Sequence, residues 1–290
     1  MYRSTFIHLT ALLLLLCSAP SFSQTVKEPT GGNPEWSKVY APFRVAGNLY
    51  YVGTYDLACY LITTPQGHIL INTGLASSFS QIKNNVEVLG FKLQDIKILL
   101  TTQAHFDHLG AMAAIKKATG ARMMADEKDA AVVADGGVSD YAFGGTVTFA
   151  PIQVDRQLRD NDIVTLGGMN VTVLHHPGHT QGSCSYLVDV KDEKNSYRVL
   201  IANMPTIVTD KALDAIPAYP DIAKDYAYTL KALQALSFDL WVSSHASQFD
   251  LHTKRKPGDA YNPEVFRDRK GFDKAVAELK AAYDKKLQAK

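Results

Sequence analysis

The segment 98–108 is the feature that most constrains how this chain can fold. An apolar run with β-type composition, 98–102, precedes Gln103-Ala104-His105-Phe106-Asp107-His108, and a helical pattern starts near Leu109. A strand, a sharp loop and a helix in this order place polar side chains in the crevice beyond the carboxyl end of the strand, where α/β folds bind ligands. His105 and Asp107, on alternate residues of a loop, can point the same way, and Zn²⁺ binds imidazole and carboxylate. A solvated polar loop is the alternative, but two histidines and one aspartate in four residues favour a metal site.

Length and charge exclude several classes of function. The chain has 290 residues, which suits one large α/β domain with a substantial core. Its 30 Lys and Arg residues nearly balance its 29 Asp and Glu residues, and the net charge is +1. Because no basic stripe is present, nucleic acid is not an expected partner. We expect a small-molecule substrate and a monomeric protein.

Residues 1–23 have the pattern of a signal peptide. Arg3 provides a short positive region, the apolar centre over 11–16 is too short to span a bilayer, and Ser21-Phe22-Ser23 offers small residues for cleavage. Cleavage before Gln24 would leave one domain, residues 24–290. We therefore expect export to the periplasm, with no membrane attachment after processing.

Three cysteines leave two questions open. Cys17 raises the alternative of a lipoprotein, which Leu16 disfavours because a small residue is expected at that position. Without the signal peptide the chain keeps Cys59 and Cys184, and one pair can form one disulfide but no disulfide framework. Cys184 fits better as a small buried hydrophobic residue.

Strands followed by helices occur twice along the chain. In the first half we expect strands at 43–45, 49–52, 58–62, 68–71 and 121–125, with helices at 77–89, 111–118 and 127–134. In the second half we expect strands at 163–166, 171–175, 185–190 and 199–202, with helices at 221–236 and 263–290. This order predicts an α/β protein in which two sheets pack face to face with helices outside.

Two further histidines follow strands. His179 comes after the turn in His175-His176-Pro177-Gly178, and His245 directly follows the apolar strand 240–242. His175 and His176 fall on opposite faces of a strand, so neither is assigned as a ligand. The candidate ligands divide into one site with Gln103, His105 and His179 and another with Asp107, His108 and His245. Two metal ions about 3.5–4 Å apart could share a hydroxide, lower its pKa toward ~7 and polarise a carbonyl.

These motifs resemble the metallo-β-lactamase superfamily, whose first signature is H-x-H-x-D-H. His179 matches its second histidine motif and His245 its final one. Along nearly its whole length the mature chain looks like a subclass B3 metallo-β-lactamase, and most of all like the GOB type. Gln103 stands where the family has its first metal histidine, and Met204 where most B3 enzymes have serine. The resemblance implies a four-layer αβ/βα sandwich with two mixed sheets and with metal at one edge between them.

The resemblance also implies a zinc-dependent reaction. A metal-activated water, oriented by Asp107, would attack the β-lactam carbonyl of penicillins, cephalosporins or carbapenems, and the amide C–N bond would break without a covalent enzyme intermediate. We expect one or two Zn²⁺ per chain, with the Asp107, His108 and His245 site the tighter, because an amide oxygen is a weaker ligand than imidazole. Thr206, Tyr141 and Met204 are candidate substrate contacts, although the Thr206 hydroxyl could equally cap a backbone group.

Two alternatives stay open. A lactonase, thioesterase or glyoxalase-II-like hydrolase would use the same fold. Such relatives usually have a bridging aspartate where this chain has Asn203-Met204. Export also disfavours this alternative, because glyoxalase II and tRNA-processing relatives work inside the cell. An exported zinc-binding protein without catalysis is supported only by Gln103.

Overall fold

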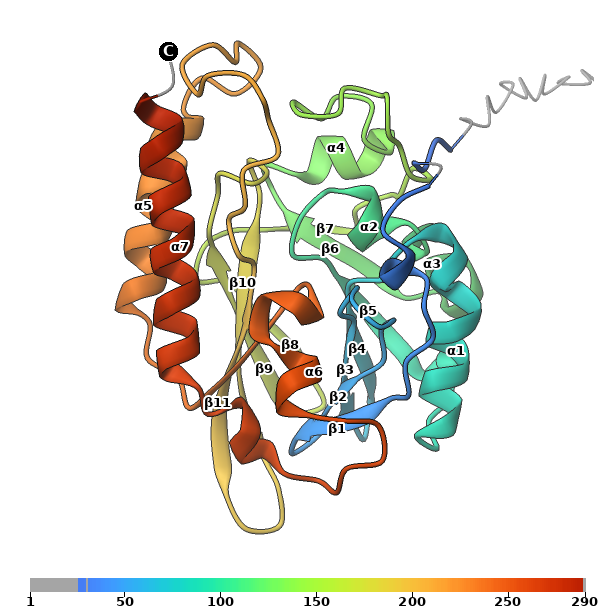
Figure 1. Ribbon diagram of the computed structural model, residues 1–290. Helices are drawn as coiled ribbons and strands as arrows, with labels where there is room; N and C mark the ends of the chain where they lie inside the picture. Colours follow the sequence, from blue (N-terminus) through green and yellow to red (C-terminus); the bar gives the residue numbers. More distant parts are fainter. Residues whose placement is uncertain (1–25, 30, 289–290) are drawn as a thin grey trace, which may run out of the picture.

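Two β-sheets packed face to face, with helices on both outer sides, form the computed structural model of this protein, which describes residues 26–29 and 31–288 (Figure 1). The two sheets are mixed, as expected, and the architecture is the four-layer αβ/βα sandwich. The expected signal peptide, including Cys17, lies outside the described residues. Within the described part, no helix is long and apolar enough to span a membrane.

The first sheet has seven strands in sequential order. They are β1 (Phe43–Ala46), β2 (Leu49–Tyr51), β3 (Tyr60–Thr64), β4 (Gly67–Ile71), β5 (Ile96–Leu100), β6 (Arg122–Asp126) and β7 (Arg156–Leu158). β1 to β4 pair antiparallel as a meander, whereas β4 to β7 pair parallel. Parallel pairs need crossover connections, and these connections place helices on the outer face of this sheet.

The second sheet has five strands in the order β12-β11-β10-β9-β8. They are β8 (Ile163–Leu166), β9 (Met169–His175), β10 (Cys184–Lys191), β11 (Ser196–Ala202) and β12 (Leu240–Ser243). β8 to β11 pair antiparallel and β12 joins β11 in parallel. Since β10 is antiparallel to both of its neighbours, β9, β11 and β12 all end at the same edge of this sheet.

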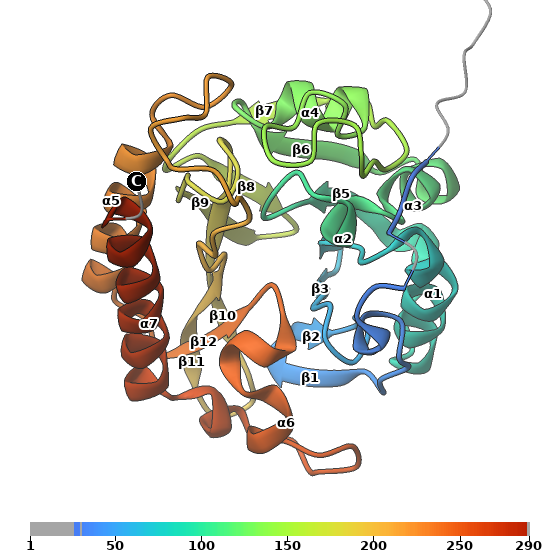
Figure 2. The same cartoon turned by 45° about the horizontal axis from the view of Figure 1, so that its top comes forward.

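Seven α-helices and five 3-10 turns complete the described chain. The helices are α1 (Phe79–Val88), α2 (Phe106–Leu109), α3 (Met112–Thr119), α4 (Ala130–Asp135), α5 (Ile222–Ala235), α6 (Leu251–Lys254) and α7 (Arg269–Gln288). The 3-10 turns are η1 (Pro34–Trp36), η2 (Ala76–Ser78), η3 (Leu93–Asp95), η4 (Ala246–Phe249) and η5 (Pro263–Phe266). Figure 2 shows α1 and α3 on one side of the sandwich and α5 and α7 on the other.

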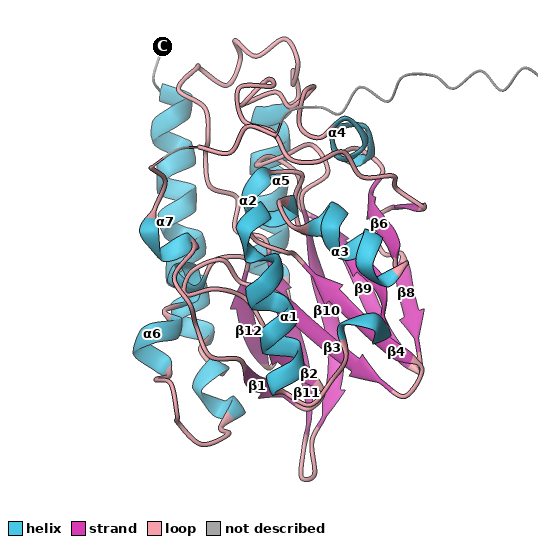
Figure 3. Ribbon diagram, turned by 90° about the vertical axis from the view of Figure 1, so that its right-hand side faces the viewer, coloured by secondary structure: helices cyan, strands magenta, loops and turns pink. Residues whose placement is uncertain are grey.

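Apolar side chains pack both helical layers against the sheets. α1 and α3 lie across the first sheet (Figure 3), and their Ile82, Val86, Met112 and Ile115 join Leu70 and Leu99 in one buried cluster. α5 and α7 cover the second sheet, where Leu230, Leu233, Phe272 and Val276 pack with Trp241 of β12. The same cluster also fills the space between the two sheets.

The two sheets are joined at the edge where β5 and β12 end. The backbone N–H of Cys184 donates to the carbonyl of Thr102 at 2.9 Å. The Tyr60 hydroxyl donates to the carbonyl of Ser243 at 2.6 Å, and Leu57 forms an isolated bridge with His245. The segments that follow β5 and β12 are therefore fixed next to each other, although they are far apart in the sequence.

Two helix boundaries differ from the expectation. The helix expected at 263–290 is split into η5 and α7, because two side chains cap two separate starts: Asn262 accepts from Glu264 N–H at 3.2 Å and Asp268 accepts from Gly271 N–H at 2.8 Å. The helix after the histidine motif begins at Phe106 and not near Leu109. Cys59 and Cys184 are both buried and free, so within the described chain they form no disulfide.

Asn85 of α1 should contribute strongly to stability. Its buried side-chain amide donates to the carbonyls of Tyr40, Val52 and Gly53 at 3.2, 3.0 and 3.1 Å. Asn85→Ala would leave these carbonyls without that donor, and we expect the free energy of unfolding to fall by about 2 kcal/mol, measured by urea denaturation. Exposed Asn84→Ala is the matched control and should change it by less than about 0.5 kcal/mol. Equal stability of the two variants would contradict this role.

Candidate metal centre

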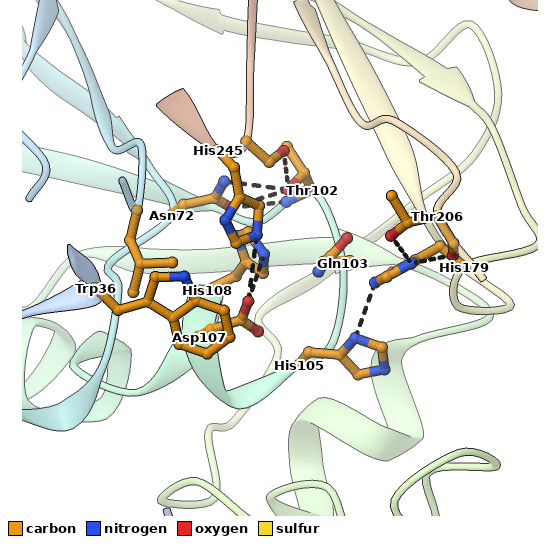
Figure 4. A network of polar contacts seen from close by, with 12 residues as sticks. Trp36, Asn72, Thr102, Gln103, His105, Asp107, His108, His179, Thr206 and His245 are labelled. Atoms are coloured by element: carbon orange, nitrogen blue, oxygen red, sulfur yellow. Dashed lines mark hydrogen bonds and ion pairs between the residues drawn. The ribbon is translucent and has the colours of Figure 1, made fainter. Parts of the chain in front are cut away.

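The first turn of α2 distributes the side chains of the histidine motif. His105 is the extended residue before the helix (φ −114°, ψ 157°), while Asp107 and His108 lie within its first turn. His105 and Asp107 therefore point apart and not the same way, because the helical turn replaces the alternation expected of a loop. Figure 4 shows His105 directed toward His179 and Asp107 toward His108 and His245.

Asp107, His108 and His245 form one compact group. The Asp107 Oδ2 atom lies 3.3 Å from His108 Nε2 and 3.3 Å from His245 Nε2. One ligand atom of each residue lies within 4.8 Å of the others, and Asp107 and His108 are buried. α2 supplies two of these residues and the end of β12 supplies the third.

His105 and His179 form a second pair. His105 Nδ1 lies 3.1 Å from His179 Nε2. This is close to the separation of about 3.3 Å that two nitrogens take at a tetrahedral ion with Zn–N bonds of about 2.0–2.1 Å. The side chain of Gln103 lies between this pair and the Asp107 group (Figure 4). The structure thus brings the six predicted ligands to one edge: Asp107, His108 and His245 form one group, His105 and His179 form another, and Gln103 lies between the two.

The outer nitrogens of three of these histidines face further polar groups. His245 Nδ1 lies 3.1 Å from Asp56 Oδ2, and His179 Nδ1 lies 2.7 Å from the carbonyl oxygen of Thr206. His105 Nε2 lies 3.4 Å from Asp140 Oδ2. Such partners fix the orientation and tautomer of a metal-binding imidazole and raise its basicity.

Asp56 and Asp140 were not predicted from the sequence. Asp56 also accepts from the Trp36 indole N–H at 3.1 Å, and the Trp36 ring lies 5.8 Å from the His245 ring. An acidic residue beside the apolar run 57–62 was an available signal for Asp56. Asp140 lies in an irregular glycine-flanked segment, and no periodicity there points to it.

The charges of the site suit a cation. Burial raises the pKa of Asp107, but His108 and His245 outweigh burial and hold the pKa well below its ordinary value. Burial lowers the pKa of His245, whereas contacts with Asp107 and Asp56 raise it to a net value of about 9. Burial and the neighbouring His105 lower the pKa of His179 to about 3. These shifts favour negative charge on Asp107 with positive charge beside it, which a proton on His245 or a metal ion can supply, while His179 is neutral at neutral pH.

The residues present fit zinc. Both ring nitrogens of His108 are buried without a hydrogen-bond partner among the described residues. Unpaired buried polar atoms are costly, and a metal ion is one partner that satisfies imidazole lone pairs. Imidazoles, a carboxylate and an amide form a borderline donor set of the kind Zn²⁺ takes.

The remaining candidates lie around the site. Thr206 backs His179, its hydroxyl 3.1 Å from His179 Nδ1. The Tyr141 hydroxyl donates to the carbonyls of His179 at 3.0 Å and Gly178 at 3.3 Å. Met204 is 3% exposed and lines, with Thr206, a hollow of about 330 Å³ beside α7. His175 and His176, which were given no ligand role, bind Asp126 and Ser185 instead.

Comparison with known proteins identifies the family. The profile described as "Metallo-beta-lactamase superfamily" matches residues 53–192. The class B3 di-zinc metallo-beta-lactamase LRA-12 from an Alaskan soil metagenome is 66% identical, with a TM-score of 0.89, over 90% of this chain and 100% of that one. The chain belongs to the metallo-beta-lactamase superfamily. Its GOB-like character agrees with GOB-18 from Elizabethkingia meningoseptica, which is 53% identical with a TM-score of 0.91, over 92% of this chain and 100% of that one.

Curated relatives of this metallo-beta-lactamase chain match a shorter stretch. A hydroxyacylglutathione hydrolase of Rhodopseudomonas palustris is 33% identical over 104 residues, which are 36% of this chain and 32% of that protein. The match thus spans about a third of the relative's length. It supports the shared metal-binding fold and leaves the substrate to be argued from the site.

Gln103 is expected to limit metal binding at the His105–His179 pair. Gln103→His should tighten that site by roughly tenfold or more, about 1.4 kcal/mol, because imidazole is a better Zn²⁺ ligand than a neutral amide. Zinc stoichiometry and competition with a coloured chelator measure this change. Gln103→Ala is the opposing control and should weaken the same site. Unchanged affinity in both variants would mean that Gln103 is not a ligand.

Proposed function

We propose that the protein is a zinc-dependent β-lactamase that hydrolyses the amide bond of penicillins, cephalosporins and carbapenems and so confers resistance. The observation that carries this proposal is the convergence of all six candidate ligands in a chain that covers the full length of class B3 relatives. The Asp107, His108 and His245 group is proposed as the tighter zinc site, because it alone contributes a carboxylate ligand. Gln103, His105 and His179 form the proposed second site.

Each residue then has a defined task in the reaction. Zn²⁺, when bound, supplies Lewis acidity that polarises a carbonyl and lowers the pKa of water toward ~7. The Asp107 carboxylate accepts a hydrogen bond from the attacking water and orients it toward the carbonyl carbon of the ring. The water oxygen bonds to the carbonyl carbon, the amide C–N bond breaks, and the ring nitrogen takes up the proton that the water loses. No side chain becomes covalently attached in this reaction.

Substrate contacts are proposed at Thr206, Met204 and Tyr141. Thr206 contacts His179, and it also lines, with Met204, the hollow beside α7, whose lining includes none of the proposed metal ligands. We propose that both residues contact the part of the substrate beyond the reacting bond. The hydroxyl of Tyr141 is already donated to backbone carbonyls. Tyr141 would therefore act through its ring and not through a new hydrogen bond.

A hydrolysis assay on metal-analysed protein tests the proposal. Nitrocefin and a carbapenem should be turned over, whereas a thioester and a lactone assayed beside them should react far more slowly. Fast turnover of the thioester with none of nitrocefin would favour the hydroxyacylglutathione hydrolase-like alternative. Against that alternative, Asn203 and Met204 follow β11 where those relatives usually carry an acid. Stoichiometric zinc with no turnover of any amide or ester would favour a non-catalytic zinc-binding protein.

We further propose that residues 1–23 are removed on export and that the mature enzyme works as a monomer in the periplasm. β-Lactams act outside the cytoplasm, so an exported hydrolase meets its substrate there. Intact mass of the periplasmic protein should correspond to a chain that begins at Gln24. An unprocessed or lipidated mass would contradict this assignment.

A further inference from the structure

Asp140 is held rigidly by its own segment of the chain. It lies between α4 and β7 and is 6% exposed. Its Oδ1 atom accepts from the backbone N–H of Ala142 at 2.9 Å and of Phe143 at 2.7 Å. These two bonds fix the carboxylate and leave Oδ2 facing His105 Nε2 at 3.4 Å.

His105 has no other described partner for this nitrogen. Its Nε2 atom is buried and makes no hydrogen bond of ordinary length among residues 26–29 and 31–288. The ring of Phe143 packs edge-on against the His105 imidazole with centroids 4.9 Å apart. The Asp140 carboxylate is therefore positioned to accept a hydrogen bond from an N–H group at His105 Nε2.

The position of that proton decides whether His105 can bind metal. A neutral imidazole carries one N–H, and the other nitrogen keeps the lone pair that a metal needs. The Nδ1–H group of His179 donates to the carbonyl oxygen of Thr206. The lone pair on His179 Nε2, which faces the His105 side of the site, is therefore available to a metal ion. His105 must carry its own proton on Nε2 to free Nδ1 in the same way.

We propose that Asp140 is a positioning residue that holds His105 as the Nε2–H tautomer and thereby makes Gln103, His105 and His179 a usable metal site. This inference rests on the proposed function, since it concerns the same metal centre. A carboxylate behind a metal ligand matters most at this site, because Gln103, His105 and His179 are all neutral ligands. The other group already includes the Asp107 carboxylate. A carboxylate behind His105 raises the basicity of a site that an amide ligand weakens.

Asp140→Asn tests the proposal with little change of shape. The introduced amide keeps an oxygen for the Ala142 and Phe143 N–H groups but presents a donor to His105 Nε2, which favours the wrong tautomer. Asp135→Asn is the matched control, because Asp135 caps Gly137, Val138 and Ser139 nearby and contacts no proposed ligand. Circular dichroism and thermal unfolding check that both variants are folded.

Zinc affinity and tautomer are the two readouts. Chelator competition should show the first site weakened by about 10–100-fold in Asp140→Asn, with the Asp107 site and the Asp135→Asn variant unchanged. Long-range ¹H–¹⁵N spectra of zinc-loaded protein, with His105 assigned by loss of its signals in His105→Gln, should show Nε2–H in wild type. Without zinc, the 3.1 Å contact with His179 Nε2 favours a proton on His105 Nδ1. Added zinc should restore turnover in Asp140→Asn.

Several results would overturn the inference. They are an Nδ1–H tautomer in the zinc-loaded wild-type protein, equal zinc affinity in Asp140→Asn and wild type, or equal losses in the Asp140 and Asp135 variants. The tautomer of His105 is measured in the wild-type protein. The inference therefore stays testable if Asp140→Asn does not fold. If the variants differ in zinc binding as predicted but the wild-type protein does not turn over β-lactams, the role of Asp140 is supported. Only the proposed function is then contradicted.

Discussion

Asp107→Ala is expected to lower kcat/KM for nitrocefin by about three orders of magnitude, within the range of about 10²–10⁴ seen when a positioned proton-transfer group is removed. Asp107 contributes the carboxylate of the Asp107, His108 and His245 group, and its Oδ2 atom faces both histidines at 3.3 Å. Its loss removes a metal ligand and the group proposed to orient the attacking water. Steady-state kinetics and zinc content, measured on the same sample, separate these two contributions.

Asp107→Asn distinguishes charge from shape. It keeps the size of the side chain but removes the negative charge, so we expect a loss of activity close to that of Asp107→Ala. If Asp107→Asn keeps its zinc and still loses turnover, orientation of water is the main role. Near-normal turnover of Asp107→Ala with intact folding would show that the metal and catalytic assignment is wrong.

Removal of metal is expected to abolish β-lactam turnover and to lower the melting temperature. Without an ion, the ring nitrogen of His108 that would bind it is left buried without a hydrogen-bond partner in the described chain, at a cost of about 1–3 kcal/mol. Metal that binds only the folded state adds about 4 kcal/mol when its free concentration is 1,000 times Kd. The shift should therefore be several degrees, measured by differential scanning calorimetry.

Reconstitution provides the control for metal removal. Zn²⁺ should restore both turnover and melting temperature, whereas Mg²⁺ should restore neither, because it requires near-octahedral oxygen ligands that a histidine-rich site does not offer. Full turnover by protein without detectable zinc would rule out the proposed chemistry. A lower melting temperature with unchanged turnover would limit the metal to a structural role.

Much of this architecture was predictable because its signals are local. The strand before Gln103 and the helices over 77–89 and 221–236 follow from apolar periodicity and turn residues. The start of α2 at Phe106 was missed, because four residues are too few for a periodic signal. The boundary between η5 and α7 was missed as well, since it depends on which side chains cap which N–H groups.

The sequence by itself determined which residue types form the site and that they follow the ends of strands. Strand ends and histidine motifs can be recognised from a few consecutive residues. The sequence also determined the two ligand groups, through the resemblance of Gln103, His105, Asp107, His108, His179 and His245 to a known pattern. Only the tertiary structure decided which carboxylate contacts the outer ring nitrogen of His245 and of His105. Asp56 and Asp140 come to His245 and His105 across 189 and 35 positions of the chain, and that approach depends on how two sheets and their loops pack. A local signal can point to an acidic residue such as Asp56, but it does not say which histidine that residue contacts.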